Sequence, residues 1–211
     1  MNDRATLLQR TLAGRLVAIV RLREQAALME VARALVAGGI TSLEFTLTTP
    51  GAVEAIAQCR AQLGDQAVIG AGTVLDAASA RRCLDAGAQF LVSPGYDLEV
   101  IETARRGGAL AMPGALTPTE IIAAWRGGAD VVKVFPARQF GPQYIRDLRA
   151  PLPEIPLMPT GGVDESNAAD YLRAGAVGVA VGGNLIDAAS VTRGDWAAIS
   201  ARARALVAAL Q

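Results

Sequence analysis

Short apolar runs alternate with alanine-rich amphipathic stretches along the whole 211-residue chain, and this alternation constrains the fold more than any other feature. The runs begin about 20 to 26 residues apart, the spacing of a strand followed by a helix and its turns. Several are apolar at successive positions, as is typical of strands that helices cover on both faces. The runs are residues 16–21, 42–47, 67–74, 90–94, 109–115, 130–136, 155–162 and 177–183.

Eight such units in a chain of this length predict an α/β fold, namely a single-domain (β/α)8 barrel of the TIM type. The rival fold is a doubly wound open sheet, which usually has fewer strands and a first-turn GxGxxG motif that this chain lacks. We expect residues 1–15 to form an extra N-terminal helix that caps the bottom of the barrel, and residues 16–211 to form the barrel. Helix starts are expected at side chains that favour N-caps: Asp76, Asp97, Thr117 and Asp164.

Composition excludes several classes of partner. Basic and acidic residues balance at 20 each, so we expect no nucleic-acid partner. No apolar run reaches the roughly 20 residues that a bilayer span needs, and the charged start MNDRATLLQRTLAGR lacks the apolar core of a signal peptide. With 2 cysteines and no disulfide framework, we expect a cytoplasmic protein that is not bound to membranes.

The basic residues carry the first functional signal. The chain has no histidine, which excludes histidine general bases and histidine-based zinc sites, and we expect neither a metal nor a cofactor. All but one of the 20 basic residues are arginine, and the exception is Lys133 in the apolar run DVVKVFP. An amine can lose its proton and attack a carbonyl, whereas a guanidinium stays charged. We interpret Lys133 as a reactive amine; the alternative is a lysine left by chance, with its stem snorkelling from a strand.

A carboxylate accompanies this amine in the predicted barrel. Glu44 lies in SLEFTLT, where a period of two places it on the same side of the strand as Thr46 and Thr48. A carboxylate inside a barrel is costly unless it is paired, and the candidate cations are Lys133 and Arg21. Glu44 is therefore either a member of a structural ion pair or an acid/base group beside a reactive amine.

Two glycine pairs follow the last two runs, at residues 161–162 and 182–183. Backbone N–H groups approach a phosphate most closely where no Cβ intervenes, and the loops after strands seven and eight form a recurrent phosphate site in this fold. Glycines required by tight turns are the alternative. An amine, a carboxylate and a phosphate site without metal ligands suggest Schiff-base chemistry on a phosphorylated keto compound, in which the imine accepts the electrons of a breaking C–C bond.

Seven stretches follow one another along the chain: ALVAGGITSLEFTLTTP, VIGAGTVLD, AGAQFLVSPG, MPGALTPTE, VVKVFPA, MPTGGV and VGGNL. Together they resemble the family of 2-keto-3-deoxy-6-phosphogluconate (KDPG) and 2-keto-3-deoxy-6-phosphogalactonate (KDPGal) aldolases. The resemblance implies a class I pyruvate aldolase, a carbon–carbon lyase that is commonly a homotrimer. It implies cleavage of KDPG to pyruvate and glyceraldehyde 3-phosphate, with KDPGal, or 4-hydroxy-2-oxoglutarate (KHG) cleaved to pyruvate and glyoxylate, as alternatives.

The same resemblance assigns expected roles to residues of this chain. Lys133 resembles the imine-forming lysine and Glu44 the proton shuttle. The residues expected around the pyruvyl group are Thr73, Pro94, Phe135 and Thr160. The residues expected at the phosphate are Gly161, Gly162, Gly182, Gly183 and Asn184.

One substrate-binding position departs from the family pattern. Many gluconate-type members have an arginine four residues after the glutamate, where this chain has Thr48, and that arginine is expected to bind an anionic group. Arg21, in a stretch similar to the galactonate-type branch, could supply the charge. FGPQYI also resembles that branch, whereas SPG and PTGGV resemble the gluconate type. KDPG and KDPGal differ only at C4, so the sequence predicts the chemistry better than the substrate.

Two other classes of function stay open at this stage. One is a barrel isomerase or epimerase acting on a sugar phosphate, and the other is a catalytically silent barrel used as an oligomeric scaffold. Both lack an imine between a lysine and a keto acid, so trapping of such an imine separates them from the aldolases.

Overall fold

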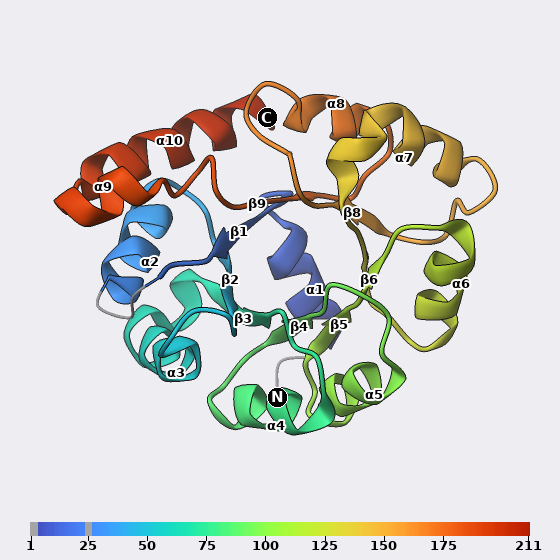
Figure 1. Ribbon diagram of the computed structural model, residues 1–211, viewed down its shortest axis with the longest axis horizontal. Helices are drawn as coiled ribbons and strands as arrows, with labels where there is room; N and C mark the ends of the chain where they lie inside the picture. Colours follow the sequence, from blue (N-terminus) through green and yellow to red (C-terminus); the bar gives the residue numbers. More distant parts are fainter. Residues whose placement is uncertain (1–3, 24–26) are drawn as a thin grey trace.

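The computed structural model describes residues 4–23 and 27–211. Its strands surround a central axis, and its helices lie outside them except for the first, which lies at the centre of the ring (Figure 1). All of the strand pairs are parallel. The predicted α/β class and the curled parallel sheet are therefore confirmed.

The strands form two sheets. The larger has the order β5-β4-β3-β2-β1-β9, and the smaller has the order β6-β7-β8. Their bounds are β1 (Leu16–Val20), β2 (Ser42–Thr46), β3 (Val68–Gly72), β4 (Phe90–Val92), β5 (Leu110–Met112), β6 (Gly114–Ala115), β7 (Val132–Val134), β8 (Leu157–Pro159) and β9 (Val179–Val181).

The expectation of one continuous eight-stranded barrel is met only in part. The fifth apolar run divides into β5 and β6 at Pro113, which has no N–H to donate to a neighbouring strand. The Pro113 carbonyl still accepts the N–H of Lys133 at 2.9 Å. A parallel bridge between Thr160 and Ala180 joins the other edges of the two sheets. The sheets are thus in contact at both seams without forming one ladder.

Helices cover the outer face of the strands. Leu35, Ile56 and Ile101 are buried on the inward sides of three of them, in the main core cluster. The outer elements are α2 (Leu28–Ala37), α3 (Ala52–Leu63), α4 (Ala77–Asp85), α5 (Leu98–Arg106), α6 (Pro118–Arg126), α7 (Gly141–Arg149), α8 (Ala168–Arg173), α9 (Ala188–Arg193), α10 (Trp196–Ala209) and the 3-10 turns η1 (Gly64–Gln66) and η2 (Ala137–Gln139).

Three predicted N-caps accept the expected backbone hydrogen bond: Asp76, Asp97 and Thr117. The fourth prediction was wrong. The helix after β8 begins at Ala168, and Asp164 lies in the preceding turn, where its carboxylate accepts hydrogen bonds from the N–H and hydroxyl of Ser166. The N–H and hydroxyl of Ser166, two residues later, thus bind the carboxylate that would otherwise cap the helix.

The amino ends of the strands are covered by α1 (Arg4–Leu12), which lies at the centre of the ring in Figure 1. Leu7 of α1 is buried in a second core cluster with side chains from the strands, among them Val17, Val68 and Phe90. Arg4 forms a salt bridge with Asp130 at 2.6 Å. With this end filled, access to the interior is left to the carboxyl ends of the strands.

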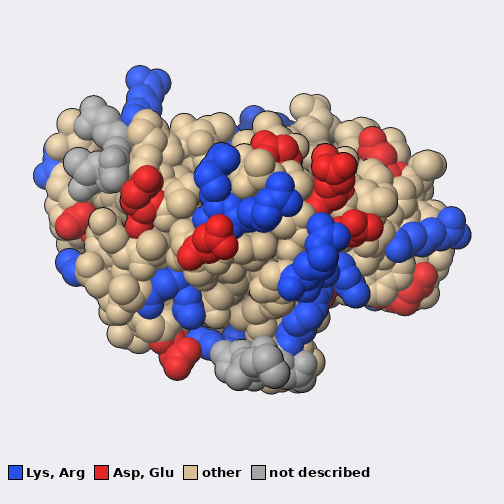
Figure 2. All heavy atoms as spheres, turned by 90° about the horizontal axis from the view of Figure 1, so that it is seen from below, with Lys and Arg blue, Asp and Glu red and all other residues tan. Residues whose placement is uncertain are grey.

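The surface fits the balanced charge of the chain. Figure 2 shows the face that includes α4 and α5, where basic and acidic side chains lie intermixed. Across residues 4–23 and 27–211, no helix is both long and apolar enough to cross a membrane. Cys59 and Cys83 are both buried as free thiols.

Candidate active site

A cleft of about 630 Å³ opens at the carboxyl ends of the strands. Apart from Glu44, every residue that the sequence predicts for the site lines it. These are Arg21, Thr48, Thr73, Pro94, Lys133, Phe135, Thr160, Gly161, Gly162, Gly182, Gly183 and Asn184. The fold therefore brings together residues from seven different strand ends, as expected for the functional face of such a fold.

Lys133 is the central residue of β7, paired with Gly114 of β6 and Met158 of β8. Only 7% of the residue is exposed, and its Nζ lies 5.1 Å from the centroid of the Phe135 ring. The ring face stabilises a cation at this distance. Within the described chain Lys133 forms no salt bridge, so no carboxylate holds its amine away from the cleft.

Glu44 lies on β2 behind the cleft and is 2% exposed. Space for its carboxylate comes from β3, because a Cβ at Gly72 would collide with Glu44 Oε1. Burial raises the pKa of Glu44, and the positive charges of Lys133 and Arg21 oppose that rise. Among the residues that the structure describes, Glu44 makes no salt bridge or hydrogen bond, which disfavours the interpretation as a structural ion pair.

Thr73, at the end of β3, has a backbone φ of 59°. A β-branched residue is strained in this left-handed region, and such strain tends to occur at functional sites. The Thr73 hydroxyl accepts a hydrogen bond from Arg21 Nη2 at 3.5 Å. Arg21, which follows β1, is thus held in the lining of the cleft by the residue that follows β3.

Thr48, which stands where the family pattern has an arginine, begins a chain of hydroxyl groups. Its hydroxyl donates to the Thr46 hydroxyl at 3.2 Å, and the Thr46 hydroxyl lies 3.2 Å from that of Thr49. The Thr49 hydroxyl accepts the N–H of Leu22 at 3.0 Å. These bonds tie the ends of β1 and β2 together but place no positive charge at this position.

The two glycine pairs differ in what their local structure requires. Gly161 and Gly162 have φ values of 89° and 80°, which favour glycine whatever the site binds. Gly182 and Gly183 are not in the positive-φ region, and a Cβ at Gly183 would meet nothing within 4 Å. Neither turn geometry nor packing therefore requires glycine at position 183.

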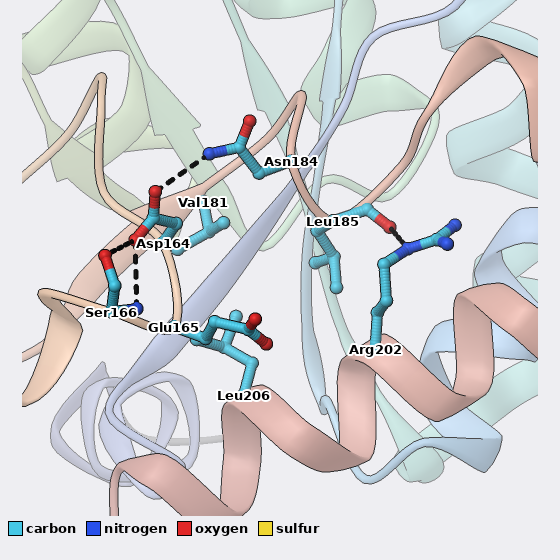
Figure 3. Close-up of a pocket in the computed structure, with 8 residues that line it drawn as sticks. All are labelled: Asp164, Glu165, Ser166, Val181, Asn184, Leu185, Arg202 and Leu206. Atoms are coloured by element: carbon cyan, nitrogen blue, oxygen red, sulfur yellow. Dashed lines mark hydrogen bonds between the residues drawn. The ribbon is translucent and has the colours of Figure 1, made fainter.

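Polar side chains tie the loops that carry these glycines to each other. Asn184 Nδ2 donates to Asp164 Oδ2 at 3.1 Å, as Figure 3 shows. Asn167 Nδ2 donates to the Gly162 carbonyl at 3.0 Å. Asn184 and Asp164 also border a second, smaller cavity of about 280 Å³ on the side of α10. Asn184 thus uses one amide donor to hold the loops in place beside the cleft.

Five residues that line the cleft were not among the site residues predicted from the sequence. Four are apolar or small and share the face of a strand or loop with predicted residues. The fifth, Arg138, is charged and belongs to η2. The missed residues are Ile19, Arg138, Val163, Ala180 and Ile186.

Comparison with known proteins identifies relatives over nearly the whole chain. The profile of the aldolase family described as KDPG and KHG aldolase matches residues 8–202. The chain is 37% identical over 193 residues to the 2-dehydro-3-deoxy-phosphogluconate aldolase of Pseudomonas aeruginosa, covering 90% of this chain and 87% of the relative. It is also 37% identical over 172 residues to the 2-dehydro-3-deoxy-6-phosphogalactonate aldolase of Escherichia coli K12, covering 81% and 83%.

Solved structures agree with these matches. The KDPG aldolase of Legionella pneumophila, with pyruvate captured as a covalent carbinolamine intermediate, superposes with a TM-score of 0.87 at 26% identity, covering 97% of this chain and 98% of that one. A native KDPGal structure gives a TM-score of 0.85 at 34% identity, covering 92% and 93%. The resemblance inferred from the sequence motifs is confirmed: the chain belongs to the KDPG and KHG aldolase family of lyases.

Proposed function

We propose that the protein is a class I, Schiff-base aldolase that cleaves KDPG to pyruvate and glyceraldehyde 3-phosphate. The observation that carries this proposal is the position of the only lysine in the sequence. Lys133 is buried in the wall of a cleft, with glycine loops on one side and a buried carboxyl group behind it. This arrangement supplies a nucleophile, a proton carrier and a phosphate site without requiring a metal.

The reaction begins when the uncharged Lys133 amine attacks the C2 keto carbon and water leaves, which forms a protonated imine. Loss of the C4 hydroxyl proton then drives cleavage of the C3–C4 bond, and the electron pair moves into the imine to give an enamine. Protonation of the enamine at C3 and hydrolysis of the imine release pyruvate. Glu44 accepts the C4 hydroxyl proton, directly or through one water, and returns a proton to C3.

The remaining residues of the cleft have positioning roles in this scheme. Thr73, Pro94, Phe135 and Thr160 surround the pyruvyl group. The phosphate lies on the two glycine loops and Asn184, where backbone N–H groups bind the anion. Thr48 contacts the hydroxyl-bearing carbons between these two groups, and Arg21 contacts the carboxylate at the pyruvyl end.

KDPGal is the second candidate substrate, because the identity to a KDPGal aldolase equals the identity to a KDPG aldolase, at 37%. We expect kcat/KM for KDPG to exceed that for KDPGal and for KHG by tenfold or more, or about 1.4 kcal/mol in transition-state binding. Pyruvate release from each compound, followed in a coupled assay, measures this ratio. A tenfold preference for either alternative would reassign the substrate.

Imine trapping tests the chemistry itself. Borohydride added together with pyruvate is expected to fix one reduced adduct on Lys133, located by peptide mass mapping. Lys133→Arg keeps the charge but cannot form the imine, so neither adduct nor turnover is expected. Absence of an adduct on folded wild-type protein would rule out the Schiff-base proposal.

Three coarser features complete the proposal. We infer that the two contacting sheets act as one closed (β/α)8 barrel, and that residues 4–15 of the expected N-terminal segment 1–15 cap it; residues 1–3 lie outside the described part of the chain. The two buried free thiols fit a reducing compartment, here the cytoplasm. A homotrimer is proposed as the assembly; among structures that match this chain is a protein cage designed by fusing symmetric oligomeric domains. Light scattering of the purified protein should give three times the mass of one chain.

A further inference from the structure

Arg138 follows β7 in the turn η2 and lines the cleft beside the first glycine loop. Its backbone N–H donates to the Gly161 carbonyl at 2.9 Å. Its side chain then passes over Gly162: a Cβ added there would collide with Arg138 Cβ and would lie 3.1 Å from Nε. The missing side chain of Gly162 is thus the space that the arginine stem occupies.

The guanidinium of Arg138 has no protein partner within residues 4–23 and 27–211. Arg4 and Arg202, in contrast, form salt bridges with Asp130 and Asp187. Arg21, the other arginine of the cleft, donates to the Thr73 hydroxyl. Arg138 is therefore the cleft arginine whose five donors are all uncommitted, and no Asp or Glu lines the described part of the cleft to neutralise it.

Backbone donors lie on the loops beside this charge. In the part of the chain that the structure describes, neither the N–H of Gly162 nor that of Gly183 donates to a protein acceptor. A guanidinium that adjoins uncommitted N–H groups suits an anion with several oxygens, because the fork of donors binds a phosphate through two parallel hydrogen bonds.

We propose that Arg138 binds the phosphate of the sugar-acid substrate together with the glycine loops, and that it determines the preference for phosphorylated over unphosphorylated substrates. This inference rests on the proposed function, because the substrate in question is the phosphorylated keto-deoxy acid.

The test compares Arg138→Gln with wild type on KDPG and on unphosphorylated KHG. Loss of a charge-assisted contact is expected to raise KM for KDPG roughly tenfold or more. Because the phosphate is remote from C3 and C4, kcat should change little. KM for KHG should change less than about twofold, since that substrate has no phosphate. Arg146→Gln, on the exposed side of α7, removes the same charge away from the cleft and should leave every constant unchanged.

Inorganic phosphate gives a second readout that does not need the natural substrate. Its binding, measured by calorimetry, should weaken by a similar factor in Arg138→Gln and not in Arg146→Gln. Equal phosphate affinity in wild type and Arg138→Gln, or an equal rise of KM for both substrates, would overturn the role of Arg138. Borohydride trapping of pyruvate separates the two proposals: an intact adduct with unchanged phosphate binding defeats only this inference, whereas a missing wild-type adduct defeats the proposed function.

Discussion

At the scale of single residues, Glu44 combines almost complete burial with the lack of a fixed partner in the described chain. A carboxylate locked in a salt bridge would be a poor proton carrier, because each transfer would break the pair. Burial raises the pKa of Glu44 and the two nearby cations limit that rise. A carboxyl group with a raised pKa and no fixed partner can both accept a proton and return it.

Glu44→Gln tests this role. We expect the variant to trap pyruvate on Lys133 as well as wild type does, because imine formation uses the amine and the shape of the cleft. Cleavage should slow by about 10²- to 10⁴-fold, the usual contribution of a positioned acid/base group. Single-turnover kinetics with KDPG measure the cleavage step. Full activity in Glu44→Gln would assign the proton transfers to another group.

At the scale of elements, the site depends on how neighbouring strands accommodate each other. Thr46 on β2 pairs with Gly72 on β3, and the missing side chain of Gly72 leaves the space that the Glu44 carboxylate fills. Gly72 was not in the sequence-based set of site residues. A glycine at a strand end can mark a bulge, a bend or the close approach of another group, and only the packing shows which side chain fills the space.

Gly72→Ala is expected to displace the Glu44 carboxyl group and so reduce kcat by at least tenfold, while pyruvate trapping on Lys133 persists. Activity and trapping assays on the same preparation make this comparison, and circular dichroism reports whether the barrel remains folded. Gly14→Ala is the matched control, because a Cβ at Gly14 meets no atom within 4 Å. Unchanged kcat in Gly72→Ala would mean that Glu44 is not constrained by β3.

The elements also show what sequence patterns do and do not encode. The spacing of the apolar runs was enough to locate the strands, because a strand that is buried on both faces is apolar at successive positions. The split of the fifth run at Pro113 and the displaced helix start after Asp164 were not foreseen. Both depend on individual hydrogen bonds rather than on hydrophobic pattern. Arg138 was missed for a similar reason: an exposed arginine in a loop has no periodicity, and only its position in the lining of the cleft distinguishes it from other surface arginines.

At the scale of the whole molecule, the buried carboxyl group of Glu44 affects folding stability. Its pKa is raised in the folded state, so the folded chain binds more protons than the unfolded chain between the two pKa values. The free energy of unfolding therefore falls as pH rises through that interval. Below the unfolded pKa both states are protonated and this cost disappears.

We accordingly expect Glu44→Gln to be more stable than wild type at pH 8 and to differ less from it at pH 4. Urea unfolding followed by circular dichroism at the two pH values gives the comparison. A stability difference that is the same at both pH values would show that Glu44 carries no burial cost in the folded protein. A variant that is more stable but cleaves more slowly would show the usual trade-off: the wild-type protein loses stability because it holds a functional group in an unfavourable environment.

The coverage of the amino ends of the strands by α1 determines how substrate enters and how products leave. Leu7 and its neighbours fill that end of the interior, so the cleft at the carboxyl ends is the entrance and the exit alike. In the proposed reaction the aldehyde fragment lies nearer the mouth and the pyruvyl fragment stays attached to Lys133. The two products must then leave in sequence, aldehyde first. Accumulated glyceraldehyde 3-phosphate would enter the cleft by the same opening through which pyruvate has to leave.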